Sequence, residues 1–304
     1  MADDVAIDAG QTGVRLALAR DGVVLSRVEG GGLTYGHDGP AAAVLAALGA
    51  LAAPFGAIGP VGTVCLGLTS VLGSDDEYAA LAAGLLAHFH ADRVVVTGDV
   101  VTSHAGALAA RPGVVLAAGT GAIALGVTAD GAHRQVDGWG HLYGDAGGGF
   151  WIGRYGLDTA MRGHDGRAVP GALTARAADV FGELDGLAER LYPGSDAVAR
   201  IAGFAREVLD LADTDDDAAA IAGRAAAELA GTVVAAGAAD ADVAVTGRLL
   251  GHHGLRRRFA AALAEREPTA RLRTSEGDGL SGAARLAATA DLGQYAGLCR
   301  VTTR

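Results

Sequence analysis

A pattern of strand, glycine-rich turn and strand occurs twice in this chain. The first copy covers residues 5–18 and the second covers residues 114–127. In each copy an apolar run ends at a Gly/Thr turn, a second apolar run follows, and the chain then reaches Asp-Gly, at Asp21 and at Asp130. Asp-Gly between apolar runs is a strong signal for a tight hairpin turn. The repetition therefore predicts two hairpins of one design, and it restricts the fold to one that uses this unit twice.

The turns of both copies have the chemistry of a phosphate site. Glycine lets the backbone approach a phosphate group closely, and the N–H groups of the turn and a threonine hydroxyl donate hydrogen bonds to it. Two such turns predict a pair of phosphate clamps, with a nucleotide held between two similar lobes. The residues concerned are Gly10, Gln11, Thr12 and Gly13 in the first turn and Gly119, Thr120 and Gly121 in the second.

The composition excludes several other kinds of site. The chain has 304 residues, enough for two domains with a sizeable core. Its formal net charge of −11 argues against a nucleic-acid partner. It contains no lysine, which excludes a Walker-type phosphate lysine, a kinase strand lysine and a Schiff-base lysine.

The two cysteines, Cys65 and Cys299, stand far apart, and neither has a nearby partner for a metal motif. We expect both to be buried, unpaired thiols in a reducing compartment. No apolar run reaches the length of a transmembrane helix, and the first residues, Met-Ala-Asp-Asp, are not a signal peptide. These observations predict a cytoplasmic protein with no membrane partner.

Hydrophobic patterning predicts alternating strands and helices up to the second hairpin, and mainly helices from about residue 153 to 239. The sequence Arg-Pro-Gly at residues 111–113 interrupts regular secondary structure and marks the predicted domain boundary. It divides the chain into an N-terminal lobe, 1–112, and a C-terminal lobe, 113–304. The last helix is expected to pack back on the N-terminal lobe. The predicted strands are residues 5–7, 14–19, 23–28, 61–68 and 94–96, and a last strand begins near Val243; the predicted helices are residues 40–53, 77–89 and 218–236, with others starting near Thr102 and Ser281.

Two aspartates end apolar strands. Asp8 precedes the first glycine turn, where a carboxylate is costly unless it is paired or binds a metal ion. It could hold Mg²⁺, or it could be a turn residue bonded to its own backbone; the paired hairpins favour the metal. Asp99 follows the strand 94–96, at the kind of strand end where α/β sheets place ligands. It could accept a proton from a substrate hydroxyl, or cap the helix expected near Thr102.

A third candidate lies in residues 138–153, which hold both tryptophans of the chain and many glycines. This density predicts a tightly folded loop that opens a helix, with Asp145 inside it. Asp145 is either a ligand-binding carboxylate or a turn residue bonded to the backbone. His141 is most simply a packing residue of the loop.

Two further patterns, one acidic and one glycine-rich, are better explained by local structure than by a binding site. The acidic run 213–217 could bind a metal ion, but it directly precedes the long helix and suits a helix start. Residues 119–124 match the dinucleotide pattern G-x-G-x-x-A, which needs a helix after the glycines. Here the continuation reads as a strand, so we set that match aside.

Taken together, these residues resemble the BadF/BadG-type ATPase family, in particular its N-acetylglucosamine kinase members. That family belongs to the larger actin, hexokinase and heat-shock ATPase fold, and the resemblance covers nearly the whole chain. The most specific part is 138–153, which is similar to the family signature G-W-G-x-x-x-G-D-E-G-S-x-x-W-I-G. The other matching segments are 8–13 and 119–121 for the phosphate motifs, 98–99 for the catalytic aspartate, 165–167, 245–248 for the adenosine motif, and 280–284 for the helix that connects back between the lobes.

The chain departs from the family at three places. The first loop of the family commonly reads Gly-Gly-Gly-Thr-Lys, where this chain has Gln11 and Gly13. The Asp-Glu-Gly-Ser of the signature is Asp-Ala-Gly-Gly here, at residues 145–148. The family's kinases often carry an asparagine after the third strand to hold the sugar; no asparagine is present in this region, and His37 or Asp38 would take its place.

The resemblance implies a two-lobed α/β protein with the actin-like ATPase (ribonuclease H-like) fold, duplicated lobes and a central cleft. It implies ATP and Mg²⁺ as cofactors, and phosphorylation of the 6-hydroxyl of N-acetylglucosamine or a related amino sugar or hexose, by a homodimer. Without lysine, Mg²⁺, backbone N–H groups and helix ends must neutralise most of the phosphate charge. The implied roles are Asp99 as the catalytic base, Asp8 at the metal, Gly10, Gln11, Thr12, Gly13, Gly119, Thr120, Gly247 and Arg248 at the nucleotide, and Thr120, Gly121, Asp145, Gly149, His37 and Asp38 at the sugar.

Two alternatives remain at this point. The same family contains activator ATPases of dehydratase and reductase systems, which hold an iron–sulfur cluster between subunits with cysteines; Cys65 and Cys299 lack the spacing for that. A sugar-sensing protein that binds without turnover is the second alternative, and the presence of Asp8 and Asp99 argues against it.

Overall fold

The computed structural model describes residues 3–10, 13–33, 39–52, 60–69, 72 and 74–304. The contacts divide the chain into two compact units. Unit 1 comprises Met1–Val115, Val127–His133 and Thr274–Arg304, and unit 2 comprises Leu116–Gly126 and Arg134–Arg273. The chain passes between the units several times, and a division between residues 112 and 113 lies close to the first of these crossings.

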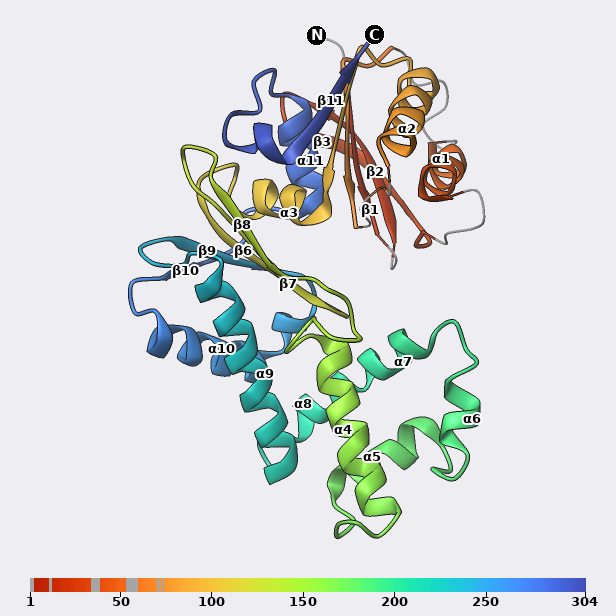
Figure 1. Cartoon of the computed structure of the whole chain (residues 1–304), viewed down its shortest axis with the longest axis vertical. Coiled ribbons are helices and arrows are strands. Elements are labelled where there is room, and N and C mark those ends of the chain that lie inside the picture. The colour runs from red at the N-terminus through yellow and green to blue at the C-terminus, as the bar shows by residue number, and fades with distance from the viewer. Residues whose placement is uncertain (1–2, 11–12, 34–38, 53–59, 70–71, 73) are drawn as a thin grey trace. The chain divides into compact units, whose positions relative to one another are not determined.

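Unit 1 is built on a six-stranded mixed sheet in the order β11-β5-β4-β1-β2-β3 (Figure 1). Strands β4 and β5 run parallel to β1, whereas β2, β3 and β11 are antiparallel to the strands they pair with. Every residue of β4 is buried, as expected for a central strand that is covered on both faces. The strands are β1 Asp4–Ala9, β2 Val14–Arg20, β3 Val23–Gly30, β4 Thr63–Leu68, β5 Arg93–Gly98 and β11 Cys299–Thr303.

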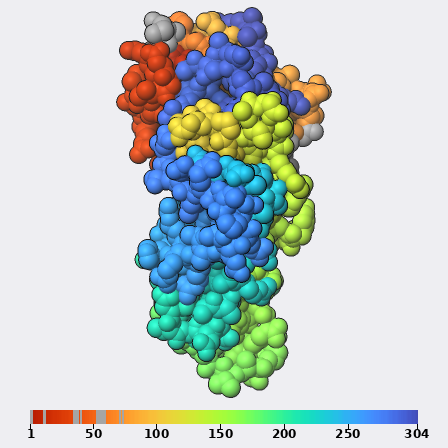
Figure 2. All heavy atoms as spheres, turned by 90° about the vertical axis from the view of Figure 1, so that its left-hand side faces the viewer, coloured from red at the N-terminus to blue at the C-terminus, as the bar shows by residue number. Residues whose placement is uncertain are grey.

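Described helices cover both faces of this sheet (Figure 1). Helices α1 and α2 bury their apolar side chains against one face, where Val44, Leu48 and Leu85 join a single core with the strands. Helices α3 and α11 lie on the other face, and Figure 2 shows blue C-terminal atoms beside red N-terminal atoms in this unit. The bounds are α1 Gly39–Ala52, α2 Asp75–His88, α3 Asp99–Ala107 and α11 Gly279–Ala287, and the short 3-10 helix η3, Gly293–Leu298, follows α11.

Helices α3 and α11 approach each other at two glycines. A Cβ atom added to Gly282 would overlap the carbonyl oxygen of Thr102, and one added to Gly106 would overlap the carbonyl oxygen of Asp278. Only glycine permits this backbone contact. The contact brings the N-terminus of α11 against the C-terminal half of α3, and it leaves Gly279 close to Asp8 near the end of β1.

The second sheet has five strands in the order β10-β9-β6-β7-β8 (Figure 1). Its long helices α4, α9 and α10 pack together around apolar side chains such as Ile152, Leu229 and Phe259. The strands are β6 Gly113–Ala118, β7 Ala122–Val127, β8 His133–Asp137, β9 Asp242–Thr246 and β10 Arg271–Arg273. The helices are α4 Gly149–His164, α5 Ala172–Phe181, α6 Leu187–Leu191, α7 Ala197–Gly203, α8 Ala205–Leu211, α9 Asp216–Ala235, η2 Leu249–Gly251 and α10 His253–Arg266.

Helix α9 confirms that the acidic run at residues 213–217 lies at the start of a helix. Asp215 is its N-cap, and Oδ1 of Asp215 accepts a hydrogen bond from the backbone N–H of Ala218 at 2.9 Å. Among the described residues, no group of three or more His, Cys, Asp or Glu side chains could hold a metal ion. Helix α9 is also the one described helix that is long and apolar enough to cross a membrane by length and composition alone, and half of this apolar segment is buried within the protein.

Both predicted hairpins are confirmed. Asp21 and Gly22 form the β2–β3 turn with positive φ angles of 52° and 77°, and Gly131, with φ of 85°, closes the β7–β8 turn. The segment after Gly121 is strand β7, so setting the dinucleotide pattern aside was right. Cys65 is buried in β4 and Cys299 is half-buried at the start of β11, and both are free thiols.

The structure differs from the sequence prediction at the starts of two helices and at strands β10 and β11, which were not predicted. The helix expected near Thr102 begins three residues earlier, at Asp99, because Gly98 serves as its N-cap without any side-chain signal. The helix expected near Ser281 begins at Gly279, within two residues of the prediction, and η3 and the edge strand β11, which were not predicted, follow it.

Candidate active site

Asp8 lies one residue before the end of β1, directly opposite Arg15 on β2. Its Oδ2 forms an ion pair with Nη2 of Arg15, and Nη1 of Arg15 reaches Oδ2 of Asp278 at 3.1 Å. The Asp8 side chain is only 13% exposed, and a Cβ atom on Gly279, the first residue of α11, would lie 2.9 Å from its Oδ2. Asp8 therefore sits between a guanidinium group and the start of a helix.

Burial raises the pKa of Asp8 to about 6, while Arg15 opposes this shift and the charge of Asp99 adds to it. Burial also raises the pKa of Asp278, but hydrogen bonds from Ser281 outweigh that effect. The backbone N–H and the hydroxyl of Ser281 both donate to Oδ1 of Asp278, and the pKa lies below its ordinary value. Nucleotide-bound Mg²⁺ usually needs only one or two protein carboxylates. The Asp8 carboxylate fits that role, with Arg15 as the competing cation at Oδ2.

Asp99 is the first residue of α3, directly after β5. Its Oδ2 accepts a hydrogen bond from the hydroxyl of Thr69 at 2.8 Å. Thr69 is in turn fixed to the end of β1, because its backbone N–H donates to the carbonyl oxygen of Ala9 at 3.1 Å. The helix begins at Asp99 and not near Thr102, and Gly98 is its N-cap, so Asp99 is a first-turn residue whose carboxylate also accepts from the backbone N–H of Val100.

Burial raises the pKa of the Asp99 carboxyl, and hydrogen bonds from Thr69 and from the backbone N–H of Val100 counteract the rise. A carboxylate with a raised pKa is a better proton acceptor than an ordinary surface aspartate. Its position at the end of a strand and the start of a helix also suits a group that meets a polar ligand. The geometry of Asp99 is therefore suited to general base catalysis.

The first glycine turn is described only at its two ends. The backbone N–H of Gly10 donates to the carbonyl oxygen of Gly13 at 3.0 Å, and a Cβ atom on Gly10 would lie 2.9 Å from Oγ1 of Thr69. The predicted nucleotide ligands Gln11 and Thr12, and the predicted sugar ligands His37 and Asp38, lie outside the described residues.

The second glycine turn is described completely, and the start of α4 is bonded to it. The backbone N–H groups of Gly149 and Phe150 donate to the carbonyl oxygens of Gly119 and Thr120 at 2.8 and 2.9 Å. A Cβ atom on Gly149 would lie 2.8 Å from the oxygen of Gly119, so the close approach requires glycine there. The turn and the N-terminus of α4 thus form one continuous backbone surface.

Asp145 joins this surface through its side chain. A Cβ atom on Gly121 would lie 2.5 Å from Oδ2 of Asp145, so the carboxylate rests against the glycine turn. Burial raises its pKa, and backbone N–H groups of Ala122 and Gly140 counteract the rise. Four of the residues predicted for the sugar, Thr120, Gly121, Asp145 and Gly149, therefore lie together in unit 2. His141 packs edge-on against Phe150, 4.8 Å between ring centres, as expected for a packing residue.

Gly247, the first residue after β9, contacts the same region. It has a positive φ of 85°, and a Cβ atom on it would overlap the carbonyl oxygen of Ala118, the residue before the second turn. Arg248, the next residue, is exposed. The predicted nucleotide residues Gly119, Thr120 and Gly247 are thus neighbours within unit 2.

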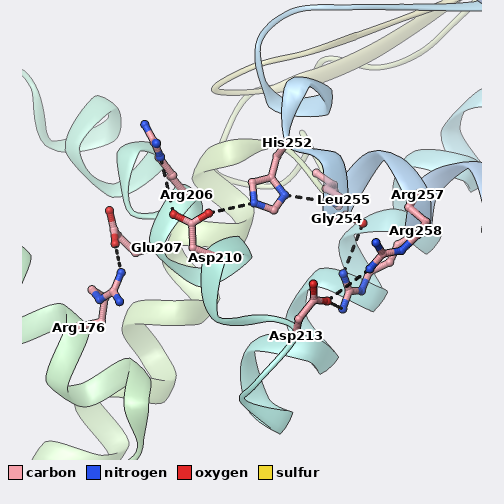
Figure 3. A network of polar contacts seen from close by, with 10 residues as sticks. All are labelled: Arg176, Arg206, Glu207, Asp210, Asp213, His252, Gly254, Leu255, Arg257 and Arg258. Atoms are coloured by element: carbon pink, nitrogen blue, oxygen red, sulfur yellow. Dashed lines mark hydrogen bonds and ion pairs between the residues drawn. The ribbon is translucent and has the colours of Figure 1, made fainter.

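The helix that follows this turn, α10, is anchored by a polar network (Figure 3). His252 is its N-cap: Nδ1 accepts from the N–H of Leu255 at 3.3 Å, which leaves Nε2 to face Oδ1 of Asp210 on α8 at 3.1 Å. Arg258 donates to the carbonyl oxygen of Ala212 at 2.8 Å and to Asp213 at 2.9 Å. These bonds hold α10 against α8 and the two residues that follow it.

A sequence model of the BadF/BadG/BcrA/BcrD ATPase family matches residues 5–287. The chain belongs to this family. Membership implies the use of ATP. The resemblance predicted from the sequence motifs is confirmed.

Several solved structures have a fold similar to that of this chain. A candidate N-acetylglucosamine kinase from Chromobacterium violaceum is 28% identical, with a TM-score of 0.75 over 95% of this chain and 99% of that one. A second candidate N-acetylglucosamine kinase, from Porphyromonas gingivalis, is 18% identical with a TM-score of 0.72 over 94% and 98%. A glucokinase of the ROK family from Streptomyces griseus, solved with glucose and AMPPNP, is 17% identical with a TM-score of 0.58 over 94% and 99%. The two-lobed α/β fold predicted from the sequence is confirmed.

One curated relative matches over a shorter stretch. The N-acetylmuramic acid/N-acetylglucosamine kinase of Clostridium acetobutylicum is 33% identical over 75 residues. The match spans 25% of this chain and 24% of that protein.

Two residues that contact the candidate aspartates, Arg15 and Thr69, were not identified from the sequence. Arg15 could have been found from the hairpin, because a turn closed between Ala9 and Val14 places residue 15 opposite residue 8. Thr69 follows β4 and carries no pattern of its own, so its bond to Asp99 depends on the parallel pairing of β1, β4 and β5.

Proposed function

We propose that this protein is an ATP-dependent sugar kinase that phosphorylates the 6-hydroxyl of N-acetylglucosamine or a related amino sugar. The observation that carries this proposal is the likeness to the Chromobacterium violaceum candidate N-acetylglucosamine kinase over nearly the full length of both chains. The shorter match to the Clostridium acetobutylicum kinase supports the same substrate class.

In the proposed reaction, Asp99 orients the 6-hydroxyl and accepts its proton. The hydroxyl oxygen then bonds to the γ-phosphorus, the bond from that phosphorus to the bridging oxygen breaks, and ADP leaves. Asp99 is suited to this step because its carboxylate is held by Thr69 and its pKa is raised by burial. Mg²⁺ held at Asp8 would neutralise charge on the phosphates.

We assign the sugar to the surface formed by Thr120, Gly121, Asp145 and Gly149. The carboxylate of Asp145 has two oxygens with acceptor capacity beyond its backbone bonds, and sugar hydroxyls are matching donors. The roles of Gln11, Thr12, His37 and Asp38 remain part of the same proposal. Gly10, Gly13, Gly119, Gly247 and Arg248 are assigned to ATP.

The experiment is a coupled ADP-release assay with ATP and Mg²⁺ and a panel of four sugars: N-acetylglucosamine, glucosamine, N-acetylmannosamine and glucose. We expect ADP release that depends on the sugar and is fastest with N-acetylglucosamine. ADP release that is equal with and without every sugar would contradict the kinase and favour an activator-type ATPase. Sugar binding without turnover would favour a sensor.

We further propose that the protein is a cytoplasmic homodimer. Its free thiols suit a reducing compartment. Light scattering on the purified full chain tests the oligomeric state, and a mass of one 30.1 kDa chain would contradict the dimer.

A further inference from the structure

Asp137, the last residue of β8, holds the loop that carries Asp145. Its Oδ1 accepts a hydrogen bond from the backbone N–H of Asp145 at 2.7 Å, and its Oδ2 accepts one from the backbone N–H of Ala146 at 2.9 Å. Both oxygens of one carboxylate thus bind consecutive N–H groups eight and nine residues further along the chain. Hydrogen bonds to an ionised acceptor are shorter and stronger than neutral ones.

The loop between Asp137 and Asp145 has little burial of its own. Trp139, Leu142 and Tyr143 are 68%, 80% and 82% exposed, so they do not anchor it in a core. The chain instead folds tightly over the carboxylate: a Cβ atom on Gly144 would lie 2.7 Å from Oδ1 of Asp137. The conformation of the loop therefore depends strongly on the two bonds to Asp137.

The backbone of Asp145 is held on both sides. Its N–H is bound by Asp137, and its carbonyl oxygen accepts from the N–H of Gly148 at 2.9 Å. Asp145 adopts a left-handed φ of 57°, which is uncommon for a residue with a side chain. In this conformation its carboxylate rests against Gly121. A rotation of the peptide before Asp145 would swing the carboxylate away from the glycine turn.

Asp137 also has a left-handed φ, of 62°. Glycine adopts this conformation freely, and the neighbouring Gly138 has a φ of 78°. An aspartate at such a position carries a conformational cost that its two backbone bonds offset. Its side chain, and not its backbone, is the reason for an aspartate at this point.

We propose that Asp137 is a positioning residue, which sets the direction of the Asp145 carboxylate and thereby the affinity for the sugar. This inference rests on the proposed sugar kinase function and on the assignment of Asp145 to the sugar. Asp137 itself touches neither sugar nor ATP in this proposal. Its loss should therefore act on sugar binding, and not on the nucleotide or on the proton transfer.

The test uses two substitutions that tolerate the left-handed backbone. Asp137→Gly keeps the turn and removes the carboxylate. Asp137→Asn keeps the shape but turns one acceptor into an NH₂ group that cannot accept from an N–H. Asp130→Asn is the matched control, because Asp130 bonds the hydroxyl of Thr128 and the N–H of Ala132 in the turn before the same strand. Asp145→Ala serves as the reference for a lost sugar contact.

The measurements on the full chain are KM and kcat for N-acetylglucosamine, KM for ATP, and the melting temperature. We expect both Asp137 variants to raise the sugar KM at least tenfold, towards that of Asp145→Ala. The ATP KM should stay within twofold, kcat should change far less than the sugar KM, and Asp130→Asn should match the parent.

Three outcomes would overturn the inference in distinguishable ways. A parent protein that turns over no sugar contradicts the proposed function, and the role of Asp137 falls with it. An active parent whose Asp137 variants keep the sugar KM within twofold contradicts the positioning role alone. Equal losses for sugar and ATP, together with a lower melting temperature, show that Asp137 only supports the fold.

Discussion

Asp8 and Arg15 stand opposite each other on β1 and β2 and form an ion pair, and Arg15 continues to Asp278 before α11. The pair joins the first glycine hairpin to the N-terminus of a helix from the other end of the chain. It also explains how a carboxylate that is mostly buried can remain at the edge of the sheet, since an unpaired charge there would be costly.

The raised pKa of Asp8 predicts a dependence of stability on pH. Folding favours protonated Asp8, because its pKa is about 6 in the folded protein against a model value of 3.8. The stabilisation of the folded protein by protonated Asp8 is fully present below about pH 4 and is lost as the pH rises through 6. The shift corresponds to about 3 kcal/mol.

Urea unfolding of the parent and of Asp8→Asn between pH 4 and 8 measures this effect. The variant should gain stability relative to the parent as the pH rises through 6. Asp130→Asn should show no such gain, because hydrogen bonds hold the pKa of Asp130 below its ordinary value. A constant difference between Asp8→Asn and the parent across this range would contradict the raised pKa.

The assignment of Asp8 to Mg²⁺ predicts a kinetic effect of the same substitution. An amide is a weaker ligand than a carboxylate for a hard cation, so Asp8→Asn should require a higher Mg²⁺ concentration for half-maximal ADP release. Circular dichroism should show that the variant is folded. If the Mg²⁺ dependence of the rate is the same as in the parent, Asp8 is not the metal anchor.

The hydrogen bond from Thr69 is predicted to lower the pKa of Asp99, the proposed base. The Thr69 hydroxyl favours the ionised form of Asp99, so Thr69→Val should raise the pKa of Asp99 further. The base form is then reached only at higher pH, so the acid limb of kcat/KM should move to higher pH. Thr69→Ser keeps a hydroxyl and should leave the limb in place. A limb that stays unchanged in Thr69→Val would separate Asp99 from the rate-controlling proton transfer.

The contact of α3 with α11 predicts a large loss of stability for Gly282→Ala. The added methyl group would overlap the carbonyl oxygen of Thr102, and overpacking of this kind costs about 1–3 kcal/mol or more. Gly223→Ala in α9 is the matched control, because its Cβ atom would meet nothing within 4 Å and should add up to about 1 kcal/mol. Thermal unfolding of both variants checks the prediction, and equal melting temperatures would contradict the tight contact.

The features predicted correctly from the sequence are those that depend on residues close together in the chain. The hairpins were found because alternation, glycine and Asp-Gly all act within a few residues, and the long helix α9 was found because its N-cap Asp215 and its apolar face are local too. The clustering of Thr120, Gly121, Asp145 and Gly149 was predicted only through the family resemblance.

What the sequence did not reveal depends on pairings between distant residues. The bond from Arg15 to Asp278 joins residues 263 positions apart, and β11 is a strand because β5 offers it a free edge. The early start of α3 at Asp99 was missed because its N-cap, Gly98, makes no side-chain bond that a pattern could signal. Asp137 was missed because its partners lie across a loop that has no regular period.

The central claim is that Asp99 serves as the base of a sugar kinase, and one comparison tests it most directly: the rate of ATP-dependent phosphorylation of N-acetylglucosamine by the parent and by Asp99→Asn. The substitution keeps the shape of the side chain and removes the proton acceptor, and loss of a general base typically lowers the rate about 10²–10⁴-fold. We predict a loss in that range, with sugar affinity, measured by calorimetry, changed far less. A variant that turns over within a few-fold of the parent, or a parent that phosphorylates none of the four sugars, would contradict the account.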